Sequence, residues 1–84
     1  MKIVWDEPKR LANIEDHHLD FADLDEAFFE NALVLPSYKR RRRGVGRHRD
    51  DVIAVIFPSW GAEAVSIISM RPASKKEKQL HAER

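Results

Sequence analysis

The sequence predicts an α+β fold with two N-terminal helices, a small, mostly antiparallel sheet of three to four strands, and a C-terminal helix. Three observations support this prediction. Apolar residues recur at helical spacing within the first thirty residues. An unbroken, mostly β-branched run over residues 51–57 is typical of a central strand that is buried on both faces. The motif Ser74-Lys75-Lys76-Glu77 matches a capping box that begins a helix, in which only Leu80 is a large apolar anchor. At 84 residues the chain is expected to form a single domain, residues 1–84.

The first helix is expected to end at about residue 17. Residues 3–5 precede it as a short apolar segment, which is either an edge strand or the lead into the helix. Asp6 is suited to cap this helix, and Pro8 fits its first turn, where the missing N–H costs nothing. Because a helix repeats every 3.6 residues, three residues spaced four apart share one polar face: Lys9, Asn13 and His17. For this face we expect a structural hydrogen-bond network between helix and sheet, in preference to catalysis.

A second helix is expected to begin near Asp20. Asp20 and Asp23 resemble a capping pair, and Leu19 and Leu24 occupy the positions of a hydrophobic staple. Carboxylates are concentrated in the first turns of this helix, where the helix dipole favours negative charge. Helix starts therefore explain most of the acidic character of the first thirty residues.

The sheet is expected in the second half of the chain. Residues 33–36 form a short extended segment that ends in proline. Residues 38–45 form either a strand with cationic side chains on both faces or a basic loop. The cluster at 58–61 indicates a turn, in which Trp60 either stacks on a base or caps a core. Residues 64–70 then resume as the return strand of a hairpin.

Charge is distributed unevenly along the chain. The formal net charge is +1, but residues 1–30 contain nine carboxylates and three cations, whereas residues 31–84 contain twelve cations and five carboxylates. Seven of the eleven residues at 39–49 are lysine or arginine. Such a cluster binds polyanions through phosphate contacts and makes the binding sensitive to salt.

Several classes of protein are excluded or disfavoured by composition. The chain has no cysteine, which excludes disulfides and thiolate metal sites. No apolar run approaches the roughly 20 residues of a membrane span, and the N-terminal segment lacks a signal-peptide pattern. His17 and His18 are adjacent, so on a helix they point about 100° apart and cannot easily share a metal ion. We therefore expect a cytoplasmic protein with no membrane partner, no metal and no cofactor.

A set of motifs occurs in the order and at the spacing of one protein family. These motifs are Trp5-Asp6-x-x-Lys9-x-x-x-Asn13-x-x-x-His17, Phe21, Ala27-Phe28, Gly46 and Ile67-Ile68-Ser69-x-Arg71-x-Ala73-x-x-x-Glu77. With them the chain resembles the BrnT family, the toxins of bacterial type II toxin–antitoxin pairs, over almost its whole length. The resemblance implies a RelE-like fold and a metal-independent endoribonuclease that arrests translation. It also implies a small antitoxin of the ribbon-helix-helix type, similar to BrnA, and contact with promoter DNA only through the toxin–antitoxin complex.

Metal-independent RNA cleavage needs a base for the 2′-OH proton, cations for the phosphorane and an acid for the leaving 5′-oxygen. Arg71 matches a family arginine at the end of the last strand and is predicted as a phosphate clamp, the alternative being a simple ion pair with a carboxylate. His81 is the candidate general acid because histidine titrates near neutrality, the alternative being a surface histidine. The predicted catalytic residues are Arg71, His81 and Arg43. The predicted RNA-binding residues are Arg41, Arg42, Arg47 and His48.

Two other functions compete with the ribonuclease prediction. The first is a catalytically weak or degenerate family member that binds antitoxin and nucleic acid, since Ser66 stands where the family usually has arginine and His81 where tyrosine is frequent. The second is a DNA-binding accessory, because a basic run supports sequence-independent binding to any polyanion. The basic run also fits an antitoxin contact, since antitoxins commonly cover the cationic groove of such toxins.

Overall fold

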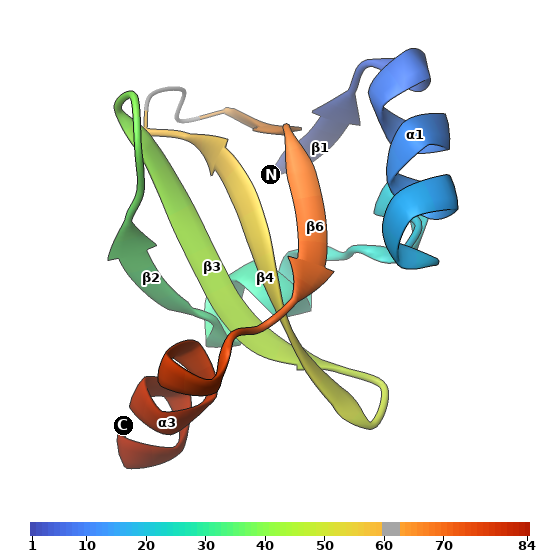
Figure 1. Cartoon of the computed structure of the whole chain (residues 1–84). Coiled ribbons are helices and arrows are strands. Elements are labelled where there is room, and N and C mark those ends of the chain that lie inside the picture. Colours follow the sequence, from blue (N-terminus) through green and yellow to red (C-terminus); the bar gives the residue numbers. More distant parts are fainter. Residues whose placement is uncertain (60–62) are drawn as a thin grey trace.

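The structure is a computed structural model that describes residues 1–59 and 63–84. The predicted turn at 58–61 lies partly, and Trp60 wholly, outside the described residues. The elements follow one another in the order β1 (Lys2–Trp5), α1 (Glu7–His17), the 3-10 helix η1 (Phe21–Asp23), α2 (Glu26–Asn31), β2 (Leu33–Pro36), β3 (Arg41–His48), β4 (Asp51–Pro58), β5 (Ala64–Ile67), β6 (Ser69–Pro72) and α3 (Lys75–Glu83) (Figure 1). Within the described part of the chain, no helix is long and apolar enough to cross a membrane.

A four-stranded antiparallel sheet in the order β2-β3-β4-β6 forms the centre of the molecule (Figure 1). The central strand expected from the β-branched run is confirmed as β4, where Ile53, Ala54 and Val55 are buried. Of the basic segment predicted at 38–45, the part from Arg41 onward is confirmed as a strand, because β3 pairs with β2 on one side and β4 on the other. Residues 38–40 form the turn before this strand. The first apolar segment is also a strand, β1, and it pairs in parallel with β5 in a separate two-stranded sheet.

The single return strand expected over residues 64–70 is wrong. The chain forms β5, which pairs with β1, and then β6, which pairs with β4. The division falls at Ile68, whose N–H donates to the carbonyl of Ile56 (2.8 Å). The physical reason is the N-terminal strand: β1 offers β5 a partner, and Ile3 and Trp5 pack with Ile67 against the main core.

The continuous second helix expected from Asp20 is also wrong. Asp20 caps η1 by accepting from the N–H of Ala22 (2.9 Å), and Asp25 caps α2 by accepting from the N–H of Phe28 (2.9 Å). Between the two caps Leu24 is extended, with φ −76° and ψ 143°. Aspartate side chains compete for backbone N–H groups, so two of them five residues apart define two short helices. Asp23 does not complete a capping pair with Asp20; it lies 3.4 Å from Arg49 instead.

The two faces of the sheet are covered unequally. η1 and α2 pack on one face around the main core, which consists of Phe21, Leu24, Phe28, Ile53, Val55, Ile67 and Met70. On the other face α3 crosses only one end of the sheet (Figure 1), above a small cluster formed by Val45, Ala54 and Ala73. Beyond α3, this second face carries a cleft lined by residues of β3, β4 and β6.

The predicted network between the first helix and the sheet rests on one residue, Asn13. Its side chain is buried, accepts from the N–H of Met70 (3.0 Å) and donates to the carbonyl of Leu19 (3.0 Å). Lys9 and His17 are exposed and take no part in it among the residues that the structure describes. Two further motif residues immediately precede the helix. Trp5 ends β1 and is half-buried against the main core, and Asp6 occupies the N-cap position of α1 without a side-chain cap bond.

Candidate active site

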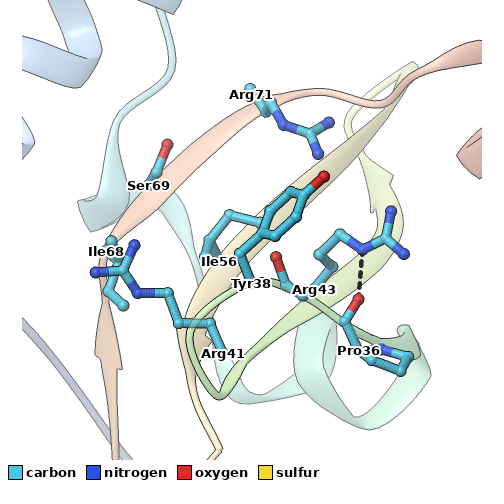
Figure 2. A pocket seen from close by; sticks show the side chains of 9 residues that line it. Pro36, Tyr38, Arg41, Arg43, Ile56, Ile68, Ser69 and Arg71 are labelled. Carbon is cyan, nitrogen blue, oxygen red and sulfur yellow. Dashed lines mark hydrogen bonds between the residues drawn. The ribbon is translucent and has the colours of Figure 1, made fainter.

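A cleft of about 620 Å³ opens on the uncovered part of the second sheet face (Figure 2). The cleft lies on the sheet, next to the part that α3 covers. Its walls come from the β2–β3 connection and from β3, β4 and β6. The residues that line it are Pro36, Ser37, Tyr38, Arg41, Arg43, Ile56, Ile68, Ser69 and Arg71.

Strand register brings the cationic side chains of the cleft together. Arg43 lies opposite Ile56, which in turn lies opposite Ser69, so these three side chains point to the same face. Arg41 and Arg71 share that face, because each is two residues from one of these positions. The sheet therefore places three guanidinium groups, from β3 and β6, around one cleft.

Glu77 of α3 joins two of these arginines. Its side chain is 1% exposed, and its carboxylate accepts two hydrogen bonds from Arg71 (2.7 and 3.0 Å) and one from Arg43 (2.8 Å). It also accepts from the N–H of Ser74 (2.8 Å) and so completes the capping box of α3. The hydrogen bond from Arg71 is the main cause that lowers the pKa of Glu77 to about 2; the bonds from Ser74 and Arg43 act in the same direction, against the effect of burial.

The ion pair considered as the alternative for Arg71 is therefore present, but it does not neutralise the cleft. Three guanidinium groups face a single carboxylate, and Arg41 has no ion pair within residues 1–59 and 63–84. Arg43 uses Nε on the carbonyl of Pro36 (2.9 Å) and Nη1 on Glu77, which leaves Nη2 free of protein partners among the described residues. Positive charge and unused donors make the cleft suited to a phosphate group.

The predicted catalytic set does not meet in one place. Arg43 and Arg71 come together in the cleft, whereas His81 lines a second cavity of about 470 Å³ together with Arg47 and His48. His81 follows Glu77 by one helical turn, which places it about 6 Å further along α3. Arg42 is exposed and points to the opposite face of β3 from its two neighbours in the sequence.

Three residues of the site were not among the predicted functional residues: Tyr38, Ser69 and Glu77. Glu77 was recognised as the last residue of a capping box and of the family-like motif, but not as a partner of arginines, because its two arginine partners lie 6 and 34 residues away. Tyr38 immediately precedes the basic run, and an aromatic residue beside cationic residues is a usable signal for RNA contact. Ser69 is visible only in the family-like motif.

The two sequence features that favour a degenerate member lie outside the cleft. Ser66 is exposed on β5, and His81 belongs to the second cavity. Within the described residues, no group of three or more histidine, aspartate, glutamate or cysteine side chains is arranged to hold a metal ion.

Comparison with known proteins identifies a protein family and a similar solved structure. A family model described as the ribonuclease toxin BrnT of type II toxin–antitoxin systems matches residues 5–77, a range that includes the cleft and Glu77. The 1.1 Å crystal structure of the ribonuclease toxin BrnT from Brucella abortus is 53% identical in sequence and superposes with a TM-score of 0.80. That match covers 89% of this chain and 99% of the Brucella chain. No curated protein matches the sequence.

Proposed function

Because this chain belongs to the BrnT family of ribonuclease toxins of type II toxin–antitoxin systems, we propose that it cleaves RNA without a metal ion and thereby arrests translation. We place the cleavage site in the cleft of Arg41, Arg43 and Arg71, on an α+β scaffold that we infer to be RelE-like. One observation carries this placement. Guanidinium groups from β3 and β6, which are separated by β4, converge on one open cleft and keep an excess of positive charge.

The chemistry follows from the donors available in the cleft. The ribose 2′-hydroxyl loses its proton as its oxygen attacks phosphorus, the P–O5′ bond breaks, and the leaving 5′-oxygen takes up a proton. The products are a 2′,3′-cyclic phosphate and a 5′-OH, and the net proton transfer is from the 2′-oxygen to the 5′-oxygen. Negative charge develops on the phosphorane oxygens, and fixed N–H donors stabilise it best when they need no reorganisation. Glu77 supplies that fixation, because it holds Arg71 through two hydrogen bonds and Arg43 through one. Charge stabilisation is assigned to the arginines that line the cleft. His81 lines the other cavity, so the general-acid role predicted for it is not part of this proposal.

A toxin of a type II system has a cognate protein antitoxin. We propose that this partner is a small ribbon-helix-helix protein, that it blocks the cleft with acidic side chains, and that promoter DNA is contacted by the antitoxin within the complex. The cationic cleft and the exposed arginines of β3 support this, since a surface that attracts phosphate also attracts carboxylates.

The decisive experiment is digestion of RNA by the purified protein in the presence of EDTA, comparing wild type with Arg71→Ala. The wild type should cleave, and Arg71→Ala should lose about 100-fold or more in rate, since removal of one donor to the developing charge costs about that much. Arg84→Ala, which removes an exposed guanidinium at the C-terminus, is the matched control and should retain full activity. Undiminished cleavage by Arg71→Ala would remove this residue from the site.

The second candidate function is a non-catalytic family member that binds antitoxin and nucleic acid. The observation in its favour is that Arg43 and Arg71 are already bound to a buried carboxylate. Under this alternative the protein co-purifies with its antitoxin, binds RNA in a salt-dependent manner and yields no 2′,3′-cyclic phosphate at any enzyme concentration.

A further inference from the structure

Tyr38 is a large apolar side chain that the fold leaves in solvent. It is 88% exposed, the highest value among the exposed large hydrophobic residues of the described chain. The other aromatic residues with assigned burial are buried or half-buried, and Phe29 packs edge to face against both Phe28 and Phe57. Packing therefore gives no reason for an aromatic residue at this position.

The turn that carries Tyr38 has an unfavourable backbone. The N–H of Arg41 donates to the carbonyl of Tyr38 (3.0 Å), and both residues inside this turn have positive φ, 55° at Lys39 and 60° at Arg40. Glycine or asparagine is the usual choice at such positions, because a β-carbon clashes there. The surroundings enforce the conformation: the N–H of Ser59 donates to the carbonyl of Arg40 (3.1 Å). Backbone strain of this kind is concentrated at functional sites.

The turn places the ring at the mouth of the cationic cleft. Tyr38 lines the same cleft as Arg41, Arg43 and Arg71. In Figure 2 its ring extends from the turn across the cleft, and its hydroxyl end points toward Arg71. A nucleobase is linked to its phosphate through one ribose, so a phosphate held by Arg43 and Arg71 brings an adjacent base within reach of this ring.

We propose that Tyr38 is the base-stacking residue of the cleft and that it selects single-stranded RNA. The inference rests on the proposed function and adds a subsite to it. Only an unpaired base exposes a face to an aromatic ring, so stacking excludes a continuous duplex. Because every base has a π-face, the subsite discriminates by strandedness much more than by base identity.

The test separates stacking from catalysis by using RNA that cannot be cleaved. A short 2′-O-methyl oligonucleotide lacks the attacking hydroxyl, and 2-aminopurine placed at successive positions loses fluorescence where it stacks. For Tyr38→Ala we expect about tenfold weaker binding, equivalent to about 1.4 kcal/mol, and no quenching at any position. Tyr38→Phe keeps the ring and should match wild type in both measurements. Leu11→Ala, which truncates an exposed apolar side chain on α1, is the matched control and should bind as wild type does.

Each of three results would overturn the stacking role. These are wild-type binding by Tyr38→Ala, equal affinity of the wild type for duplex and single strand, and loss of quenching in Tyr38→Phe as complete as in Tyr38→Ala. Circular dichroism of each variant checks that the fold is kept. Failure of the proposed function is distinguishable: the wild type would then leave unmodified RNA intact while Tyr38-dependent quenching of the 2′-O-methyl oligonucleotide persisted.

Discussion

At the scale of single residues, Glu77 determines how the arginines of the cleft are held. A carboxylate that is 1% exposed is stable only when its charge is paired and hydrogen-bonded. Here Arg71, Arg43 and the N–H of Ser74 together provide four hydrogen bonds. The same contacts connect α3 to β3 and β6, so Glu77 links the stability of the C-terminal helix to the geometry of the cleft.

The lowered pKa of Glu77 predicts a pH-dependent stability. Its pKa falls from the ordinary 4.5 to about 2 in the folded protein, so its contribution is fully present above about pH 4.5 and is lost as the pH falls through 2. The shift corresponds to about 3 kcal/mol of unfolding free energy. Urea unfolding at pH 7 and at pH 2 should show Glu77→Gln less stable than wild type at pH 7 by about this amount and nearly equal to it at pH 2.

Glutamine retains an oxygen for the N–H of Ser74, so this variant keeps the capping box. It removes the charge, and its amide nitrogen replaces the oxygen that accepts from Arg43 and Arg71. Glu83→Gln, at the exposed end of α3, is the control and should follow the wild type at both pH values. A constant difference between wild type and Glu77→Gln from pH 7 to pH 2 would contradict the assigned pKa.

At the scale of elements, the packing of α2 on β3 depends on a glycine. A β-carbon at Gly46 would lie 2.9 Å from Cε2 of the buried Phe28 ring, whereas one at Gly44 would meet Phe57 at 3.4 Å, an ordinary contact. Gly46→Ala should therefore destabilise the protein by about 1–3 kcal/mol through overpacking. Gly44→Ala should be neutral or stabilising by up to about 1 kcal/mol, because alanine loses less backbone entropy in a strand. Thermal unfolding of the two variants in parallel measures the difference, and equal effects would rule out the predicted clash with Phe28.

The sequence predicted elements well where a local signal and tertiary packing agree. β4 and α3 are examples, since a β-branched run and a capping box each specify one outcome. The second helix was predicted as continuous because helical periodicity does not show where a capping aspartate interrupts it. The division between β5 and β6 depends on β1, a partner more than sixty residues away, and pairing partners are not encoded locally.

The candidate site was predictable only in part, because it too depends on contacts between residues far apart in the sequence. Arg43 and Arg71 were identified from the basic run and from the family-like motif, and register places both in the cleft. Their common partner Glu77 was not, because burial of a carboxylate depends on the docking of α3. His81 was expected beside Arg71, but the direction of α3 places it in the second cavity.

At the scale of the whole molecule, the acidic and basic halves of the sequence contribute differently. Much of the acidic half serves the fold: Asp20 and Asp25 cap helices, and Asp20 also binds Arg10 (2.8 Å). The hydrogen bond from Arg10 is the main cause that lowers the pKa of Asp20. In the basic half, by contrast, the arginines of β3 lie on the surface of the sheet. Alternation along β3 divides them between two faces, with Arg41 and Arg43 toward the cleft and Arg42 away from it.

This division predicts different salt dependences for neighbouring arginines. RNA bound in the cleft releases counterions in proportion to the phosphates that the protein neutralises, with a slope of log K against log salt of about −0.7 per contact for single strands. Arg41→Gln should therefore make the slope shallower by about 0.7, whereas Arg42→Gln, which removes the same charge from the opposite face, should leave it nearly unchanged. Binding of the uncleavable oligonucleotide between about 50 and 200 mM salt gives both slopes. Equal changes in the two variants would mean that RNA wraps the end of β3 and contacts both faces of the sheet, because counterion release counts contacts and not net charge.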